Sequence, residues 1–218
     1  MVLIPGKTRI ARIWTYVRDE RSWASEVSPA VLFRSTPDRK GIHPHAHLAN
    51  LTGALHADGY AGFDRLFETG RIHEIACWAH ASCKLFDLYE ATASPIAKEA
   101  LDRIGALYAI ASEIRGKPPD KRRAARQARA GPLLDDLRAW LVATIRKSSK
   151  KSDAAGAIRY TLSRWQALCR YRDDGRGELD TLLNERCDAL LLGVKSPIHR
   201  RRYRGRARCR HLCPDRRS

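Results

Sequence analysis

The amino-acid sequence predicts an α/β fold that carries a large all-helical insertion. Short runs rich in β-branched and aromatic residues lie in the first third of the chain. Two of these runs, 53–58 and 72–78, are separated by a helical segment, and such a succession makes the two strands parallel neighbours. From Ser94 onward, apolar residues recur instead with the 3.6-residue period of helices. Strands are therefore expected first and a block of helices after them.

The first predicted elements form a β-hairpin. Residues 13–17 alternate as a strand does, residues 30–34 are a second β-rich run, and a polar connection joins them. Three alternating histidines follow, His43, His45 and His47. On a strand they would share one face and could bind a metal. Pro44 favours the start of a short helix instead, on which alternate residues do not converge on one point.

The strand–helix–strand unit covers residues 53–78. Asp58 ends the first strand, and a glycine-rich turn, Gly59–Gly62, follows it. Open α/β sheets bind ligands at the carboxyl ends of their strands. Position alone makes Asp58 a candidate site residue, with a turn or capping role as the alternative.

The helical block is predicted from periodicity and capping signals. Ser94 is a favourable N-cap and Pro95 a favourable first helical residue, and the apolar stripe then continues to Arg115. A basic, alanine-rich helix follows, Gly131-Pro132 interrupts it, and two further amphipathic helices end near Tyr171. We therefore expect an α/β core over 1–84, a helical subdomain over 85–171, a returning segment over 172–195 and a disordered arginine-rich tail over 196–218.

The charge of the chain predicts a polyanionic partner. The net charge is +17 over 218 residues, and nucleic acid is the first candidate for such a chain. In the basic helix, four cationic side chains lie near one face and could contact DNA phosphates: Lys121, Arg122, Arg126 and Arg129. A solvated helix surface is the alternative.

Membrane and disulfide classes are disfavoured. No apolar run approaches the roughly 20 residues of a transmembrane helix, and the N-terminal apolar run is too short for a signal peptide. A cytoplasmic chain with free thiols and no membrane partner is therefore expected. Cys77, His80 and Cys83 have a spacing that could supply three zinc ligands, but no fourth ligand lies nearby. A role for His80 in packing or near an active site is the alternative.

Several segments, in this order and spacing, resemble the central part of bacterial transposases of insertion sequence family 66, members of the DDE group. The matching segments are LHADGYAGF (55–63), CWAHA (77–81), SPIA (94–97), AIRY (157–160) and SRW (163–165). The resemblance extends from about Gly6 to Lys195. It implies a partial ribonuclease-H-like fold, with a mixed sheet and flanking helices, and DNA cutting and strand transfer that use Mg²⁺ or Mn²⁺.

The resemblance also assigns site residues. In DDE enzymes three carboxylates converge on two divalent metal ions. Asp58 matches the second carboxylate and Glu185 the third, with Arg186 beside it as a DNA-binding candidate. In the family the first carboxylate stands on a strand before the segment that Gly6–Thr8 matches, so it is expected to be absent from this chain. Asp58 and Glu185 are expected to lie close enough to share a metal.

Two hypotheses follow. The first is a DDE transposase fragment that is truncated at the N-terminus, has a frameshifted tail and is inactive without its first carboxylate. The second is a non-catalytic, basic DNA-binding remnant able to associate with full-length transposase or with itself. A metal-dependent nuclease assay distinguishes them.

Overall fold

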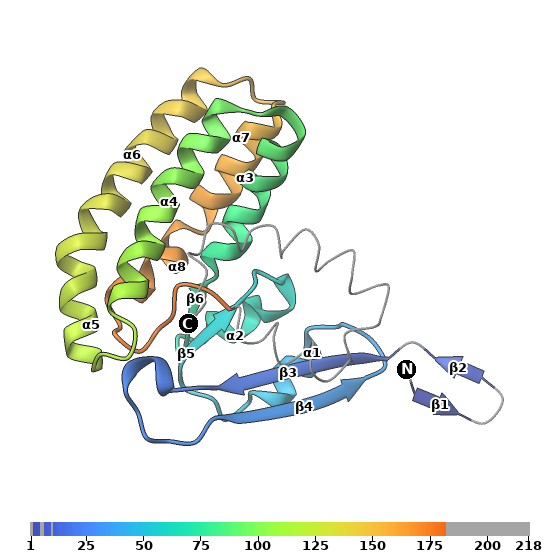
Figure 1. Ribbon diagram of the computed structural model, residues 1–218. Helices are drawn as coiled ribbons and strands as arrows, with labels where there is room; N and C mark the ends of the chain where they lie inside the picture. The colour runs from blue at the N-terminus through green and yellow to red at the C-terminus, as the bar shows by residue number, and fades with distance from the viewer. Residues whose placement is uncertain (1, 5–6, 10, 182–218) are drawn as a thin grey trace.

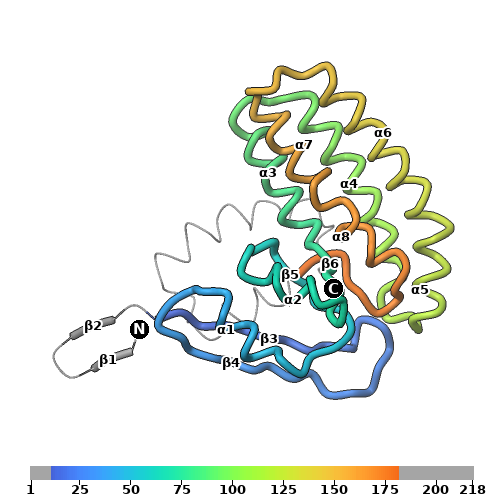
Figure 2. Tube along the Cα trace, turned by 180° about the vertical axis from the view of Figure 1, so that it is seen from behind, coloured from blue at the N-terminus to red at the C-terminus, as the bar shows by residue number. Residues whose placement is uncertain are grey.

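The structure is a computed structural model that describes residues 2–4, 7–9 and 11–181 (Figure 1). The helices that follow residue 77 stand together on one side of the molecule, and the strands lie at their base with two short helices beside them. The turned view in Figure 2 shows the same separation. An α/β chain with a helical block after the strands is what the sequence predicted.

The predicted hairpin is present as β3 (Arg12–Arg18) and β4 (Ala30–Thr36). The two strands are antiparallel, with Trp14 opposite Arg34. A short 3₁₀ turn, η1 (Arg21–Trp23), lies between them. A smaller antiparallel pair, β1 (Val2–Ile4) and β2 (Lys7–Arg9), precedes the hairpin.

One face of the hairpin packs against the rest of the chain through Trp14. Its Nε1 donates to Thr36 Oγ1 at 2.8 Å, and its ring packs near the rings of Tyr60 and Phe63, each 6.0 Å away between centroids. The histidine segment forms a short helix, α1 (Ile42–His47), as Pro44 predicted. His47 Nδ1 lies 2.9 Å from the hydroxyl of Tyr16, so this helix is fixed to the same face.

The opposite face of the hairpin is uncovered. The cross-strand register places Ile13, Val31 and Phe33 on this face, and their exposed fractions are 44%, 43% and 40%. Within the described residues β4 pairs with β3 alone, so β4 is also an edge strand. An exposed apolar edge is a site of self-association.

Replacing Phe33 by lysine is expected to reduce this self-association. A charged side chain on an edge strand opposes pairing with a second chain. Because Phe33 is already exposed, the free energy of unfolding should change by less than about 1 kcal/mol. Light scattering over a concentration series measures the first effect, and thermal unfolding followed by circular dichroism measures the second. Phe33→Leu is the apolar control, and equal scattering from the two variants would contradict the expectation.

The strand–helix–strand unit is confirmed. Strands β5 (Gly53–Ala57) and β6 (Ile72–Ala76) pair in parallel, and the 3₁₀ turn η2 (Ala61–Phe63) and helix α2 (Asp64–Glu68) connect them. The single mixed sheet that the resemblance implies is not formed by the described residues, which make three separate two-stranded sheets. No described strand forms hydrogen bonds with both the hairpin and the parallel pair, so the two remain separate sheets.

The helical block is confirmed and begins at Trp78. Its elements are α3 (Trp78–Thr92), α4 (Pro95–Glu113), α5 (Pro119–Ala125), α6 (Gly131–Lys147), α7 (Asp153–Ser163), α8 (Trp165–Cys169) and the 3₁₀ turn η4 (Arg170–Arg172). Ser94 caps α4 as expected, and its Oγ accepts from the amide of Ala97 at 3.3 Å. Gly131-Pro132 does not interrupt the helix, which corrects the prediction. A π-helical turn (Arg126–Ala130) precedes Pro132, and such a turn can accommodate a residue that lacks an amide proton.

Trp78 joins the helices to the parallel strands. Its side chain is fully buried, its Nε1 donates to the carbonyl of Leu168 at 2.9 Å, and its ring packs edge-on against Trp165. The core continues from Ile75 on β6 into the helical block. Among the described residues, no helix has the length and apolar character needed to cross a membrane.

Candidate active site

Asp58 directly follows β5 and forms the turn after it. One carboxylate oxygen accepts from the amide of Tyr60 at 3.1 Å, and Gly59 has a φ of +81°. The backbone is in the left-handed region at Gly59, which glycine adopts without strain. The carboxylate is thus held at the carboxyl end of β5, next to Ala57, the buried residue of that strand.

Helix α7 reaches this turn from the helical block. A Cβ atom at Gly59 would lie 3.1 Å from Arg164 Cζ and 3.1 Å from the Tyr160 hydroxyl. Burial raises the pKa of Tyr160, the charge of Arg164 opposes the shift, and the negative charge of Asp58 adds to it. Two residues about 100 positions from Asp58 in sequence therefore adjoin its turn.

A buried ion pair fixes α7 to strand β6. Arg164 Nη2 pairs with the carboxylate of Glu74, and both side chains are mostly buried. Arg170 Nη1 donates to the carbonyl of Glu74 at 2.7 Å. Burial raises the pKa of Glu74 even though Arg164 opposes the shift.

Helix α3 contributes a lysine to the same region. Lys84 Nζ lies 4.5 Å from the centre of the Tyr160 ring, and Lys84 is exposed. Arg164 thus pairs with Glu74 and adjoins the Asp58 turn, and Lys84 lies over the ring of Tyr160, whose hydroxyl adjoins the same turn.

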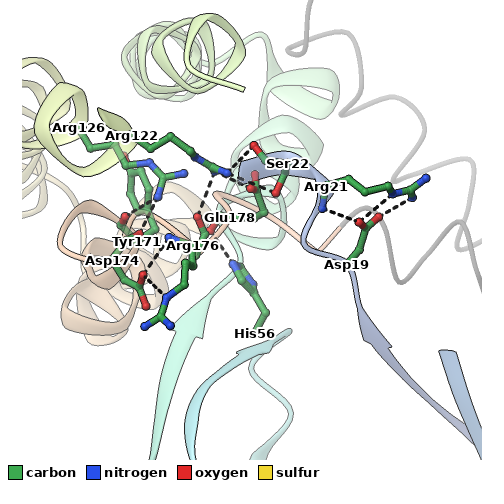
Figure 3. A network of polar contacts seen from close by, with 11 residues as sticks. Asp19, Arg21, Ser22, His56, Arg122, Arg126, Tyr171, Asp174, Arg176 and Glu178 are labelled. Carbon is green, nitrogen blue, oxygen red and sulfur yellow. Dashed lines mark hydrogen bonds and ion pairs between the residues drawn. The ribbon is translucent and has the colours of Figure 1, made fainter. Parts of the chain in front are cut away.

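The chain returns from the helical block to the ends of β5 and β6 (Figure 3). His56 Nε2 donates to the carbonyl of Glu178 at 2.6 Å, and the amide of Trp78 donates to the carbonyl of Leu179 at 3.0 Å. Thr181 donates to Cys77 Sγ from both its amide and its hydroxyl. The predicted return to the strand that carries Asp58 is therefore present. Glu185, Arg186 and the tail lie outside the described residues, so the closeness of Asp58 and Glu185 stays a prediction.

Arg122 and Arg126 do not lie on the exposed face that the sequence predicted. Each is 1% exposed. Arg122 donates to the carbonyl of Ser22 at 2.7 Å and to Glu178 Oε1 at 2.5 Å. Arg126 donates to the carbonyls of Tyr171 and Asp174, both at 2.8 Å (Figure 3). Because both guanidinium groups are enclosed by protein, they are not available to DNA phosphates in this fold.

The other two cations of that helix stay at the surface. Lys121 is exposed, and Arg129 is 2.6 Å from Glu113 at an exposed position. A phosphate contact by either stays a prediction. The spacing of four residues from Arg122 through Arg126 and Ala130 to Leu134 continues into the buried stripe of α6, and that spacing could have revealed the burial.

The zinc-ligand candidates Cys77, His80 and Cys83 do not form a metal site. Burial raises the pKa of Cys77 to about 12, which disfavours the thiolate that binds metals. No group of three or more histidine, cysteine, aspartate or glutamate side chains within the described residues could hold a metal ion. Asp58 alone does not make a metal site, so a metal there would need ligands from outside those residues.

Comparison with known proteins adds to this geometry. The family described as "Transposase IS66 family" matches residues 2–187. Three uncharacterized proteins of Sinorhizobium fredii are similar: y4hP is 34% identical over 78% of this chain and 34% of its own length. The protein y4jD is 33% identical over 84% of this chain and 38% of its own length, and y4qI is 34% identical over 83% of this chain and 35% of its own length. The chain thus spans little more than a third of the length of these curated relatives, and no solved structure matches it.

Proposed function

Because the chain belongs to the IS66 transposase family, we propose that it is part of a DDE transposase, an enzyme that cuts and joins DNA at insertion-sequence ends. The observation that carries the proposal is the placement of Asp58. It directly follows a parallel strand, β5, and the return segment contacts that strand and the end of β6. Several distant parts of the chain converge there, as a site on an α/β sheet requires.

In this proposal Asp58 and Glu185 hold Mg²⁺ or Mn²⁺ together with phosphate oxygens of DNA. Of two such metals, one would activate the attacking oxygen and the other would stabilise the leaving oxygen. Arg186, next to Glu185, would contact the DNA backbone. Glu185 follows the last described residue by four positions, and that residue already touches Cys77 at the end of β6.

The proposed fold of the core is ribonuclease-H-like, with the division into domains expected from the sequence. The supporting observation is the order of its elements, an antiparallel hairpin followed by a parallel pair and a helical insertion.

We propose further that this chain binds DNA without transferring strands. The resemblance assigns two of the three carboxylates to these residues, Asp58 and Glu185, and without a third ligand both metal affinity and the orientation of the attacking oxygen would be lost. The second candidate is a basic DNA-binding unit that associates with full-length transposase or with itself. The net charge of +17 favours binding in either case.

DNA binding is expected to survive Asp58→Ala, because binding depends on the cations of the chain and this substitution removes none of them. Incubation of labelled duplex with the chain and Mg²⁺ or Mn²⁺ is expected to give no cleavage products on a denaturing gel. Asp64→Ala, at an exposed position on α2, is the matched control. Metal-dependent cleavage that Asp58→Ala abolishes and Asp64→Ala does not would overturn the inactive assignment and establish an active site at Asp58.

A further inference from the structure

We propose that Lys84, Tyr160 and Arg164 bind a phosphate of the DNA backbone beside Asp58. The inference rests on the proposed function, because it takes DNA as the ligand. It moves the contact from the basic helix over residues 121–129, where the sequence placed it, to the surface between α3 and α7.

The first support is the position of the three side chains. Helices α3 and α7 pack against each other, and this packing brings Lys84 over the ring of Tyr160 at 4.5 Å. The hydroxyl of Tyr160 and the guanidinium of Arg164 then adjoin the Asp58 turn at Gly59. An ammonium, a hydroxyl and a guanidinium from two helices thus meet at the carboxyl end of β5.

The second support is that hydrogen-bond donors are available there. Within the described residues Lys84 has no carboxylate partner, whereas Lys98 lies 2.7 Å from Asp102 and Arg129 lies 2.6 Å from Glu113. Arg164 uses Nη2 for Glu74, and its guanidinium makes no other hydrogen bond to the described residues. A guanidinium has five N–H donors, so it can hold a carboxylate on one side and a phosphate on another.

The third support is the charge of the surroundings. A phosphodiester placed next to Asp58 would be repelled by that carboxylate unless cations stand beside it. Lys84 supplies such a cation, and Arg164, whose charge is matched by Glu74, adds hydrogen-bond donors. Lysine binds phosphate as a point charge, and the face of the tyrosine ring holds the ammonium by a cation–π interaction. The three groups together suit a singly charged phosphodiester.

The test compares Lys84→Ala with Lys147→Ala, which removes the same charge from an exposed position at the end of α6. Fluorescence anisotropy of a labelled duplex, without metal and at several salt concentrations, gives Kd and its salt slope. Lys84→Ala is expected to weaken binding about 5- to 10-fold and to reduce the salt slope by about one. Lys147→Ala should change Kd less than about twofold, and Lys84→Arg should keep most of the affinity because it keeps the charge.

A second measurement locates the contact in the unmodified chain. Acetylation of surface lysines, read by mass spectrometry, should slow at Lys84 when DNA is added and stay unchanged at Lys147. Equal effects of the two alanine variants on Kd, together with equal acetylation of Lys84 with and without DNA, would overturn this inference and leave the proposed function standing. A chain that binds no DNA at low salt would overturn the proposed function with it. Circular dichroism melting of each variant confirms that the fold is retained.

Discussion

The chain is expected to bind duplex DNA without sequence preference, and removal of His199–Ser218 is expected to weaken that binding more than any single substitution. This segment holds nine arginines and one aspartate, so its deletion lowers the net charge from +17 to +9. Neutralising a phosphate releases counterions, and the slope of log K against log salt changes by about 0.9 for each phosphate that is no longer neutralised. The deletion should therefore lower the affinity steeply at low salt and flatten the slope.

Titration of labelled duplex at four or more salt concentrations, with and without the segment, measures both effects. A matched control replaces the nine arginines by lysine, which keeps the charge and should keep the slope. An affinity that does not depend on salt would contradict the electrostatic account. A slope unchanged by the deletion would show instead that the rest of the chain carries the phosphate contacts.

Arg122→Ala is expected to have the largest effect on stability, lowering the free energy of unfolding by about 3 kcal/mol. The guanidinium is 1% exposed and ties three parts of the chain together: η1 through Ser22, the return segment through Glu178, and its own helix. Removing it leaves the carboxylate of Glu178 without its cation and the carbonyl of Ser22 without this donor. Urea unfolding followed by circular dichroism measures the change.

Arg123→Ala is the control, since Arg123 is the exposed neighbour and should change stability by less than about 0.5 kcal/mol. Arg122→Lys should recover only part of the loss, because an ammonium cannot reproduce the forked geometry of the guanidinium. A loss as small as that of Arg123→Ala would show that the buried pair does not hold the return segment in place.

The same pair predicts a dependence on pH. Burial raises the pKa of Glu178, but the charge of Arg122 and hydrogen bonds from Ser22 and Arg122 outweigh it and hold the pKa below its usual range. A carboxyl with a lowered folded-state pKa stabilises the fold above its unfolded pKa, about 4.3, and loses this contribution as the pH falls through the folded value. The difference between the chain and its Arg122→Ala variant should therefore shrink below about pH 4.

The elements predicted from local pattern are present. The hairpin, the strand–helix–strand unit and the helix capped by Ser94 depend on neighbours within a few residues, and periodicity and capping record those neighbours. The position of Asp58 at a strand end follows from the same local signals. Its assignment as a catalytic carboxylate came from family resemblance and stays a proposal.

The basic helix over residues 121–129 shows a feature that local sequence pattern did not predict, the burial of two arginines. Arg122 and Arg126 have the composition of a solvated surface, yet they lie in the interior, because their partners come from about 45 to 100 residues away. Their four-residue spacing with Ala130 and Leu134 follows the buried stripe, but burial of a charged side chain also requires oxygens that meet its donors, and a local window of sequence does not contain those distant oxygens. Tyr160 and Arg164, which adjoin the Asp58 turn, likewise come from a distant part of the sequence. The hairpin, the parallel pair, the helix capped by Ser94, the strand-end aspartate and the family could be predicted from the sequence. Two features were decided only by the tertiary structure, because each depends on contacts between groups that are distant in sequence. One is the packing of α7 against the Asp58 turn, and the other is the burial of Arg122 and Arg126 against the return segment.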